Sequence, residues 1–498
     1  MTKTTVGRAR GRKKTIKKKA GRERVSTASA VRAPRLGTYT EAVRYLVDGR
    51  VDLERTRLSR LKKTEFKLDR MRALARAMDN PQDELRIVHV AGTKGKGSVC
   101  EMVSGALSAC GFTVGLYTSP HLVDLRERIR VGGEMITYPA FAKAMQVVAR
   151  AAAKVERRHG PATYFELLTM LALQHFADQA VDVAVIECGL GGRLDATNIV
   201  KPEVTAVTGI SLDHVDVLGA TEVEIAREKA GVFKEGVPAL TIQHPAPILQ
   251  ALRESAETAG TTLEVVGKDI DFSYRFESTP KYGPHTCVCL NTSRSAFEHL
   301  VVPLPGEHQA LNCGLALAIL DRLRALGFDT PETRVIAGLE GMRIPGRMEV
   351  VFPSPRVLVD GAHNAASIQA LMKSIGLHVP YDSMVVVFGC SEDKDVDGML
   401  RHIALGADKV IFTRARGNPR ALDPYDLRSR FGEISSKMAQ VEPTLPEALS
   451  TAAPAVGRDD LICVTGSFYL VGEAKKHLAH KLAQAEAHRA ERRSPLSR

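Results

Sequence analysis

The chain has 498 residues, 44% of them hydrophobic and 25% charged, so it is long enough for two or three domains with full cores. No apolar run approaches the roughly 20 residues of a membrane helix, so we expect no membrane span. No apolar segment follows the basic N-terminus, which argues against a secretory signal. Its eight cysteines form no C-x-x-C pair, which argues against a disulfide framework or a zinc site and favours a reduced, cytoplasmic compartment.

The net charge of +12 is concentrated at the N-terminus, because residues 1–35 hold 13 Lys or Arg and one acid, Glu23. The rest of the chain is neutral, with equal numbers of basic and acidic residues. We expect residues 1–36 to form a disordered basic tail, since so charged a segment repels itself and cannot build a core. Such a tail can bind polyanions non-specifically or serve only as a solvated extension, and the sequence leaves both alternatives open.

From about residue 40, apolar strand-like runs alternate with helical patterns, which indicates an α/β fold around a parallel sheet. The strands expected in this first series are 86–92, 113–119, 181–189, 203–210 and 237–242. A helix is expected from Val99 to Cys110 and another over 308–325. Between them, 267–300 predicts hairpins or an irregular insertion, in which Cys287 and Cys289 are interpreted as small, half-buried strand residues.

A Pro/Gly break at 341–347 predicts a hinge, and a second α/β series follows it. Its expected strands are 356–364, 383–389, 408–415 and 460–467. We therefore expect a larger α/β domain at 37–343, a smaller one at 344–482, and a charged tail at 483–498.

The stretch HVAGTKGKGSVC, residues 89–100, places a glycine-rich turn between a strand and a helix. Such a turn aims backbone N–H groups and the positive end of the helix dipole at a phosphate. Lys96 would reach the terminal phosphates and Ser98 would face a magnesium ion, while Gly95 and Gly97 would allow close approach. The stretch lacks the first glycine of the standard P-loop, so a tight turn with an incidental lysine stays open as the alternative.

Other expected strands also end in polar side chains that could carry chemistry. Glu187 ends a strongly apolar strand, where magnesium would compensate a buried carboxylate, although a loop cap or a pair with Arg193 explains it equally well. His214 follows the next strand and would lie near Glu187 if both strand ends meet in one crevice. In the second domain, Asp360 and His363 follow a strand and suit ribose or phosphate contact.

Two further basic residues are less specific. Arg347 follows the predicted hinge and could bridge the domains to a phosphate. Lys229 lies in a helical pattern with Glu224 and Arg227, and its spacing favours a solvated, salt-bridging helix face.

Taken in order, these segments resemble the folylpolyglutamate synthase and dihydrofolate synthase family of the Mur-type ATP-dependent amide ligases. The matching pieces include HVAGTKGKGS, YTSPHLVDLRERIRVGG, TYFELLTMLAL, ECGLGGRLDATN, SLDHVDVLG, IAREKAGVFK, PGEHQALNCGLAL, PGRMEV, VDGAHN, FGCSEDKD and VTGSFYLVGE, spanning residues 39–473. The family's glycine-rich turn is of the G-T-x-G-K-[GST]-[ST] type, which explains the departure from the standard P-loop. The resemblance implies a P-loop-type central sheet domain followed by a smaller Rossmann-like α/β domain.

The resemblance also implies roles for individual residues. It puts the phosphates of ATP on Gly95, Lys96, Gly97 and Ser98, with further nucleotide contacts from Asn312, Arg347 and Asp360. Magnesium would be held by Ser119, Glu187 and His214. The implied catalytic residues are Lys96, His214, Lys229 and His363, and Lys229 matches a lysine that is carbamylated in relatives. The positions that match the pterin site are Thr163, Tyr164, Phe165, Glu166, Gly192, Arg193 and Asp195, with Arg70 and Met71 the nearest match before the glycine-rich turn.

The implied reaction uses ATP and Mg²⁺ to add L-glutamate to a folate, and to dihydropteroate, through an acyl phosphate that releases ADP and phosphate. The expected partners are therefore small molecules, for a cytoplasmic monomer without membrane contact. Two alternatives remain. A Mur-type ligase of cell-wall precursors is disfavoured by the folate-type segments SPHL and GLGGRLDATN, and a nucleotide-regulated nucleic-acid binder would depend on the basic tail.

Overall fold

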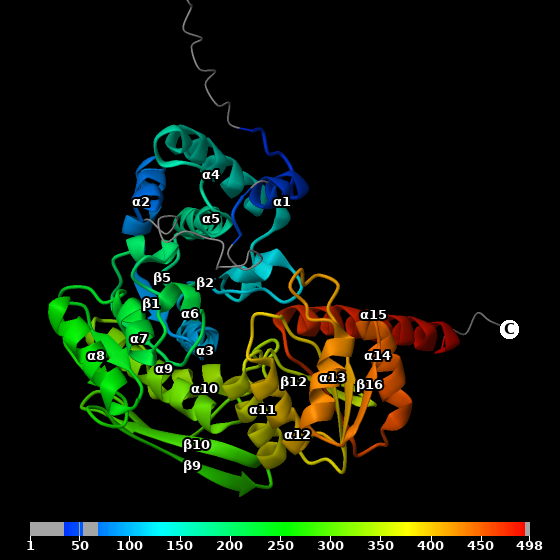
Figure 1. Cartoon of the computed structure of the whole chain (residues 1–498). Helices are drawn as coiled ribbons and strands as arrows, with labels where there is room; N and C mark the ends of the chain where they lie inside the picture. The colour runs from blue at the N-terminus through cyan, green and yellow to red at the C-terminus, as the bar shows by residue number, and fades with distance from the viewer. Residues whose placement is uncertain (1–33, 49, 53–67, 494–498) are drawn as a thin grey trace, which may run out of the picture.

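The protein, seen in a computed structural model, consists of two α/β units that follow each other in the chain (Figure 1). The structure describes residues 34–48, 50–52 and 68–493. The expected basic tail therefore lies almost wholly outside the described residues, as does part of the charged stretch before the glycine-rich turn. The α/β class expected from the sequence is confirmed.

An eight-stranded sheet forms the centre of the larger unit, in the order β4-β3-β2-β5-β1-β6-β7-β8. Six neighbouring strands, β2, β5, β1, β6, β7 and β8, pair in parallel. At the edge beyond β2, β3 and β4 pair antiparallel. Their bounds are β1 Ile87–Ala91, β2 Val114–Tyr117, β3 Ile129–Val131, β4 Glu134–Met135, β5 Val183–Glu187, β6 Val204–Val207, β7 Ala239–Thr241 and β8 Leu263–Val265. Every strand expected in this half is present within shorter bounds, because the flanking polar residues enter loops.

Helices cover both faces of this sheet, as a parallel sheet requires. One face packs against α3, α9 and α10, and the other against α1, α2, α4 and α5, while α7 and α8 cover the end near β7. The bounds are α1 Tyr39–Val47, α2 Leu68–Arg76, α3 Lys96–Ala109, α4 Tyr138–His159, α5 Tyr164–Asp178, α6 Val215–Leu218, α7 Glu222–Ala230, α8 Ala246–Thr258, α9 Glu307–Ala325 and α10 Glu332–Leu339. Strand residues alternate between the faces, so Val88 joins the first core and Ile87 the second.

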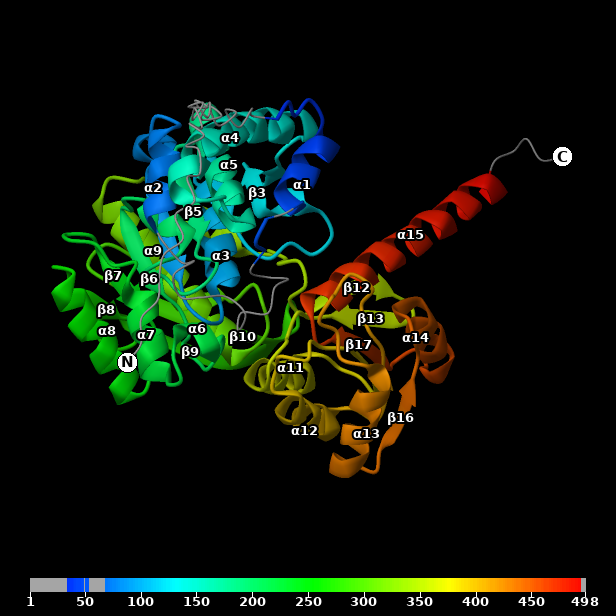
Figure 2. The ribbon, with the colours of Figure 1, turned by 45° about the horizontal axis from the view of Figure 1, so that its top comes forward.

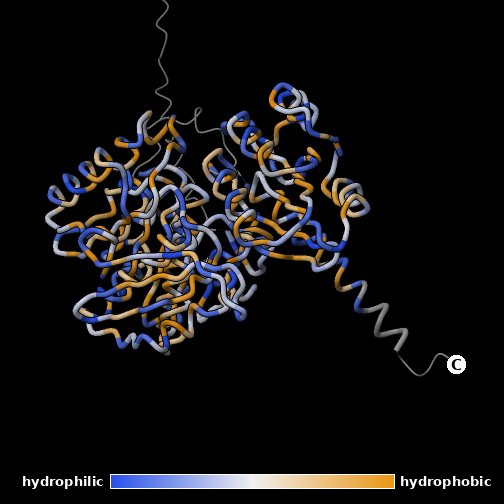
Figure 3. Tube along the Cα trace, turned by 90° about the horizontal axis from the view of Figure 1, so that it is seen from below, coloured by the Kyte–Doolittle hydropathy of each residue, from blue (hydrophilic) through white to orange (hydrophobic). Residues whose placement is uncertain are grey.

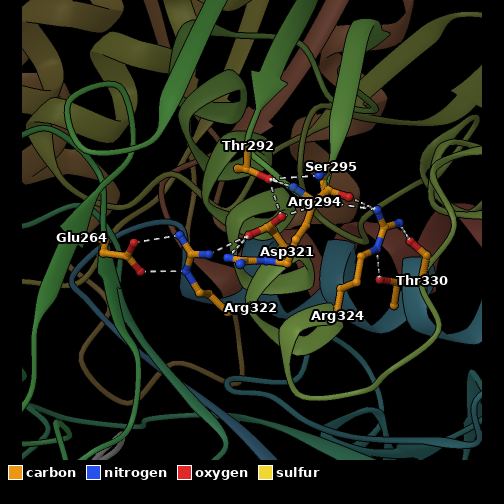
Figure 4. A network of polar contacts seen from close by, with 8 residues as sticks. All are labelled: Glu264, Thr292, Arg294, Ser295, Asp321, Arg322, Arg324 and Thr330. Carbon is orange, nitrogen blue, oxygen red and sulfur yellow. Dashed lines mark hydrogen bonds and ion pairs between the residues drawn. The ribbon is translucent and has the colours of Figure 1, made fainter.

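The turn-rich stretch before α9 forms a separate antiparallel sheet of β9 Asp271–Thr279, β10 Gly283–Asn291 and β11 Ala296–Val301. A polar network joins this insertion sheet to α9 (Figure 4). Asp321 of α9 is 1% exposed and accepts hydrogen bonds from Thr292 Oγ1 at 2.6 Å and Ser295 Oγ at 2.8 Å. Arg322 bonds the same carboxylate at 2.7 Å and reaches Glu264 of β8 at 2.7 Å. The network therefore fixes the insertion sheet to the central sheet.

The second unit has a six-stranded sheet in the order β12-β13-β17-β14-β15-β16, parallel except at β12. The predicted hinge, 341–347, lies between α10 and β12. The strands are β12 Glu349–Pro353, β13 Arg356–Val359, β14 Met384–Phe388, β15 Lys409–Phe412, β16 Met438–Val441 and β17 Leu461–Thr465; the helices are α11 Ala365–His378, α12 Val396–Gly406, α13 Pro424–Ile434, α14 Leu445–Ala452 and α15 Phe468–Arg493. The last helix runs through most of the expected charged tail and extends away from the body (Figure 2).

The hydropathy of the chain follows this layering, with apolar residues along the inner strands and polar ones on the outer helices and loops (Figure 3). Short 3₁₀ helices complete the described elements: η3 Pro81–Glu84, η4 Leu125–Arg128, η5 Ala196–Ile199 and η6 Ala453–Ala455. Among the described residues, no helix combines the length and the apolar character that crossing a bilayer would need.

Candidate active site

A cavity of about 810 Å³ lies between the two units and is lined by residues of both. Its walls include residues that follow β1, β5 and β6 in the larger unit and β13, β14 and β17 in the smaller one. Open α/β sheets bind their ligands at such strand ends. The residues expected from the sequence that line it are Gly95, Lys96, Gly97, Ser98, Ser119, Thr163, Tyr164, Phe165, Glu166, Glu187, Asp195, His214, Asn312, Arg347, Asp360 and His363.

The glycine-rich turn leads from β1 into α3 at the cavity wall. Gly95 caps the helix with a φ of 89°, a left-handed conformation that favours glycine. A Cβ at this position would collide with the amide of Asn312, so α9 can approach the turn only because Gly95 has no side chain. Lys96 begins the helix, with Nζ 3.5 Å from Thr93 O. The helix N-terminus and an ammonium group therefore lie together, which is the arrangement of a phosphate cradle.

Glu187, the last residue of β5, is 4% exposed. Its Oε2 accepts a hydrogen bond from the backbone N of Ser119 at 2.9 Å. Burial raises the pKa of Glu187, and the positive charge of Lys96 opposes that shift. A Cβ on Gly97 would stand 3.6 Å from Oε2, so the start of α3 passes this carboxylate at contact distance. A buried carboxylate beside a serine on a cavity wall suits a hard divalent cation.

An ion pair joins the two units across the cavity. Lys394, in the loop after β14, lies with Nζ 3.1 Å from Asp213 Oδ1, in the loop after β6. Burial alone would raise the pKa of Asp213, but His214 and Lys394 hold it well below its ordinary value. Burial lowers the pKa of His214 to about 4, so its imidazole is neutral at pH 7 and can accept a proton or ligate a cation.

Lys229 does not lie on a solvated, salt-bridging face, which corrects the expectation from its spacing. The residue is 4% exposed, and its Nζ donates a hydrogen bond to Gly92 O at 2.7 Å, directly after β1. Burial and the nearby Lys96 lower the pKa of Lys229 to about 7. Burial therefore favours the neutral, reactive form of this amine.

The smaller unit contributes a compact set of polar groups at the end of β13. Asp360 is 8% exposed and accepts hydrogen bonds from Met348 N at 2.9 Å and Ala362 N at 2.8 Å. Arg347 lies 4.8 Å above the ring of Phe468, and the ring of His363 lies 5.5 Å from the same phenyl group. Burial lowers the pKa of His363 to about 4. Phe468 thus orders one cation and one neutral imidazole on the same wall.

Comparison with known proteins places this arrangement in a family. The pattern of the Mur ligase middle domain matches residues 90–320, and that of the Mur ligase glutamate ligase domain matches 346–468. The dihydrofolate synthase/folylpolyglutamate synthase of Bacillus subtilis is 31% identical over 414 residues, 82% of this chain and 94% of that protein. The chain belongs to the folylpolyglutamate synthase/dihydrofolate synthase family of Mur ligases.

A solved family structure has the same fold as this member. The folylpolyglutamate synthase of Mycobacterium tuberculosis, complexed with ADP, matches with a TM-score of 0.79 and 31% identity over 88% of this chain and 98% of that one. A probable bifunctional folylpolyglutamate synthase/dihydropteroate synthase of Halobacterium salinarum is 33% identical over 449 residues, 90% of this chain. The chain spans about half the length of that longer relative, 52%.

In this Mur ligase, the segment expected to bind the pterin begins α5 at the cavity wall. Thr163 caps the helix, and Glu166 accepts hydrogen bonds from Thr163 N and Arg70 Nε, each at 2.7 Å. Glu166 is 6% exposed, so its charge is neutralised by Arg70 before any ligand binds. Arg70 lines the cavity, whereas Met71 is fully buried in the core beneath α4.

Two other expected pterin residues lie behind the wall of the cavity. Gly192 packs on the backbone of Lys229, and Arg193 donates to Glu228 Oε1 at 2.7 Å on the outer surface. Asp195 does line the cavity, but its carboxylate caps the loop, accepting from Leu190 N at 2.8 Å and Thr197 N at 3.0 Å. Direct contact by Gly192 and Arg193 therefore has no support from this geometry, and their role stays a prediction.

The main residue that sequence reasoning missed is Lys394. The motif FGCSEDKD was recognised, but no function was assigned to its lysine. The available signal was the position of the motif, because it follows an apolar strand of the second sheet. Phe468 was missed for a different reason, since an aromatic residue at the start of a helix usually packs in a core.

Proposed function

We propose that this Mur ligase adds L-glutamate to a folate, and to dihydropteroate, at the expense of ATP. The observation that carries the proposal is the shared cavity, which brings the glycine-rich turn and Glu187 of one unit against Asp360 and His363 of the other. Relatives named for both activities support the two acceptors. The complex of the Mycobacterium tuberculosis protein with ADP supports the nucleotide.

ATP would place its phosphates on the turn formed by Gly95, Lys96, Gly97 and Ser98, because that turn combines free N–H groups with an ammonium group. Asn312 faces the same turn from α9. On the other wall, Arg347 and Asp360 would hold the remainder of the nucleotide. The two domains would then be joined through their shared ligand, in addition to the Lys394–Asp213 ion pair.

The residues at the strand ends fit Mg²⁺. Glu187 is a buried carboxylate whose pKa burial raises, a cost that a bound cation would offset. Ser119 and the neutral His214 would complete the protein ligands on this wall of the cavity. When bound, Mg²⁺ would neutralise charge on the transferring phosphoryl group.

The protein's own groups would then position each step. The folate carboxylate attacks the γ-phosphate of ATP and displaces ADP, and Lys96 stabilises the charge that develops on the phosphate oxygens. Glutamate's amine attacks the resulting acyl phosphate, with neutral His363 available to accept its proton. The tetrahedral intermediate collapses to amide and phosphate. Closure of the two units excludes water, which would otherwise hydrolyse the acyl phosphate.

Lys229 supports a second element of the proposal, its conversion to a carbamate. A pKa of about 7 leaves much of the amine neutral, and only a neutral amine attacks carbon dioxide. The product would carry a carboxylate next to Gly92, close to the start of the glycine-rich turn. Intact-protein mass spectrometry in bicarbonate buffer, with Lys229→Met as the control, would detect the modification.

Phosphate release with ATP, Mg²⁺ and glutamate tests the main proposal. Dihydropteroate and tetrahydrofolate serve as acceptors, and a UDP-muramoyl peptide serves as the control for a cell-wall ligase. We expect release with a pterin acceptor only. Lys96→Ala should abolish it while circular dichroism stays unchanged, since among the described residues Lys96 Nζ donates a hydrogen bond to Thr93 O alone, at 3.5 Å. Release with neither pterin would refute the assignment.

A further inference from the structure

The insertion sheet carries a group of side chains that the reaction does not use. Within the described residues, Glu277, His285 and Cys287 have ligand atoms that all lie within 4.8 Å of one another. None of the three lines the cavity between the units. Glu277 stands opposite His285 in the antiparallel register of β9 and β10, and Cys287 follows two residues later on the same face.

The imidazole of His285 is oriented for ligation. Its Nδ1 lies 2.7 Å from Gly283 O, and because a carbonyl only accepts, Nδ1 carries the proton. Nε2 then points towards Glu277 Oε2, 4.0 Å away. The two atoms are too far apart for a direct hydrogen bond, and a cation between them would bind both. A backbone carbonyl that fixes the far ring nitrogen is also the usual support of metal-binding histidines.

The separation between the sulfur and one carboxylate oxygen fits a small tetrahedral site, and the imidazole nitrogen would move inward from 4.0 Å to join them. Zinc bonds of about 2.3 Å to sulfur and about 2.1 Å to oxygen separate the two ligand atoms by about 3.6 Å in tetrahedral geometry. Cys287 Sγ donates a hydrogen bond to Glu277 Oε2 at 3.6 Å, and zinc would replace the thiol proton at that separation. Cys287 is 2% exposed and His285 is 8% exposed, so both are held in place by the sheet.

We propose that Glu277, His285 and Cys287 bind a zinc ion that joins β9 to β10. A thiolate, an imidazole and a carboxylate together form a donor set that zinc prefers over magnesium. Water would complete the coordination, because His299 contacts Arg275 instead. Arg275 also contacts Glu277 Oε1, so it leaves Oε2 for the metal.

The site is structural rather than catalytic. Val288 and Leu290, the alternate residues of β10, belong to the core that contains α9. That helix carries Asn312 at the phosphate turn. Zinc would therefore stabilise the insertion sheet, which packs against the helix that carries Asn312. The absence of a C-x-x-C pair argues against a zinc site of the usual cysteine-pair type, whereas these ligands come from two strands and include one cysteine.

Cobalt substitution of the full chain tests the site. The protein is stripped with a chelator and titrated with Co²⁺ in excess Mg²⁺ and ADP, which occupy the nucleotide site. We expect a thiolate-to-cobalt charge-transfer band in the near ultraviolet, displaced by about one equivalent of Zn²⁺. Cys287→Ser should abolish the band, and Glu277→Gln should weaken zinc affinity at least about 10-fold.

Cys289→Ser is the matched control, because Cys289 lies on the same strand and face but outside the group. It should keep the band and the zinc affinity. The proposal is wrong if wild type gives no band, or if the band survives Cys287→Ser. Glu277→Gln keeps the shape of a partly exposed side chain, so this variant should fold. If its zinc affinity equals that of wild type, the proposal is wrong, even if Cys287→Ser fails to fold.

Discussion

Gly472 of α15 lies against the backbone of Leu122 in the larger unit, and replacing it with alanine tests whether this contact sets the distance between the two units. In a helix, Gly→Ala normally stabilises by about 0.5–1 kcal/mol. Here, however, the added Cβ would fall well inside 3.0 Å of the carbonyl oxygen of Leu122, a distance that real Cβ atoms essentially never show. Leu122 belongs to the larger unit and follows the segment that carries Ser119.

The collision must separate the units, because neither side yields easily. The Leu122 loop is fixed by Glu127, which accepts hydrogen bonds from Leu122 N at 2.7 Å and Val123 N at 2.9 Å. A displacement of roughly 1 Å in an active site can lower the rate about 100-fold. We therefore expect Gly472→Ala to reduce kcat/KM for folate-dependent phosphate release on the order of 100-fold, while thermal unfolding shows no loss of stability in the smaller unit.

Gly432→Ala is the control, because Gly432 also lies in a helix of the smaller unit, α13, and a Cβ there would meet nothing within 4 Å. It should retain full activity. If Gly472→Ala works at a rate within about threefold of wild type, the reasoning that the α15–Leu122 contact sets the domain distance is refuted.

Three further predictions rest on buried groups. Gly95→Ala should lower the free energy of unfolding in urea by about 1–3 kcal/mol and weaken ADP binding in calorimetry, because the left-handed turn and the amide of Asn312 both oppose a side chain. Gly97→Ala should cost less, since a Cβ there would meet Glu187 at an ordinary contact distance. Asp321→Ala should cost about 1–3 kcal/mol in the same urea assay, since it removes the acceptor of the Thr292 and Ser295 hydroxyls while Arg322 keeps its pair with Glu264. A loss well under about 1 kcal/mol would contradict the network. Because the pKa of Lys229 is lowered in the folded state, the unfolded chain binds more protons than the folded one between about pH 7 and 10.5, and the free energy of unfolding rises with pH in that range. Lys229→Met should flatten this slope by up to about 1.4 kcal/mol per pH unit. An unchanged slope would argue against a neutral buried amine.

The sequence was sufficient for most of the fold because each buried strand is a short apolar run that stops at polar residues. The run that ends at Glu187 is an example, and its neighbours β1 and β6 were found by the same pattern. The antiparallel edge of the central sheet was not expected, since β4 spans only Glu134–Met135 and shows no periodicity. A strand of that length is defined by its hydrogen bonds to β3 and not by its composition.

The pattern of an apolar strand followed by polar residues located the site residues at the strand ends. It could not predict which partners are contacted by side chains elsewhere in the chain. Lys229 and Arg193 illustrate the difference, because both were basic residues in polar surroundings. Lys229 turned inward to the carbonyl of Gly92, whereas Arg193 turned outward to Glu228. Between them, Gly192 has no side chain, so this loop lies directly against the backbone of Glu228 and Lys229 in α7. Packing between segments far apart in the sequence therefore determines which of two similar cations faces the chemistry, and composition alone carries no signal for that choice.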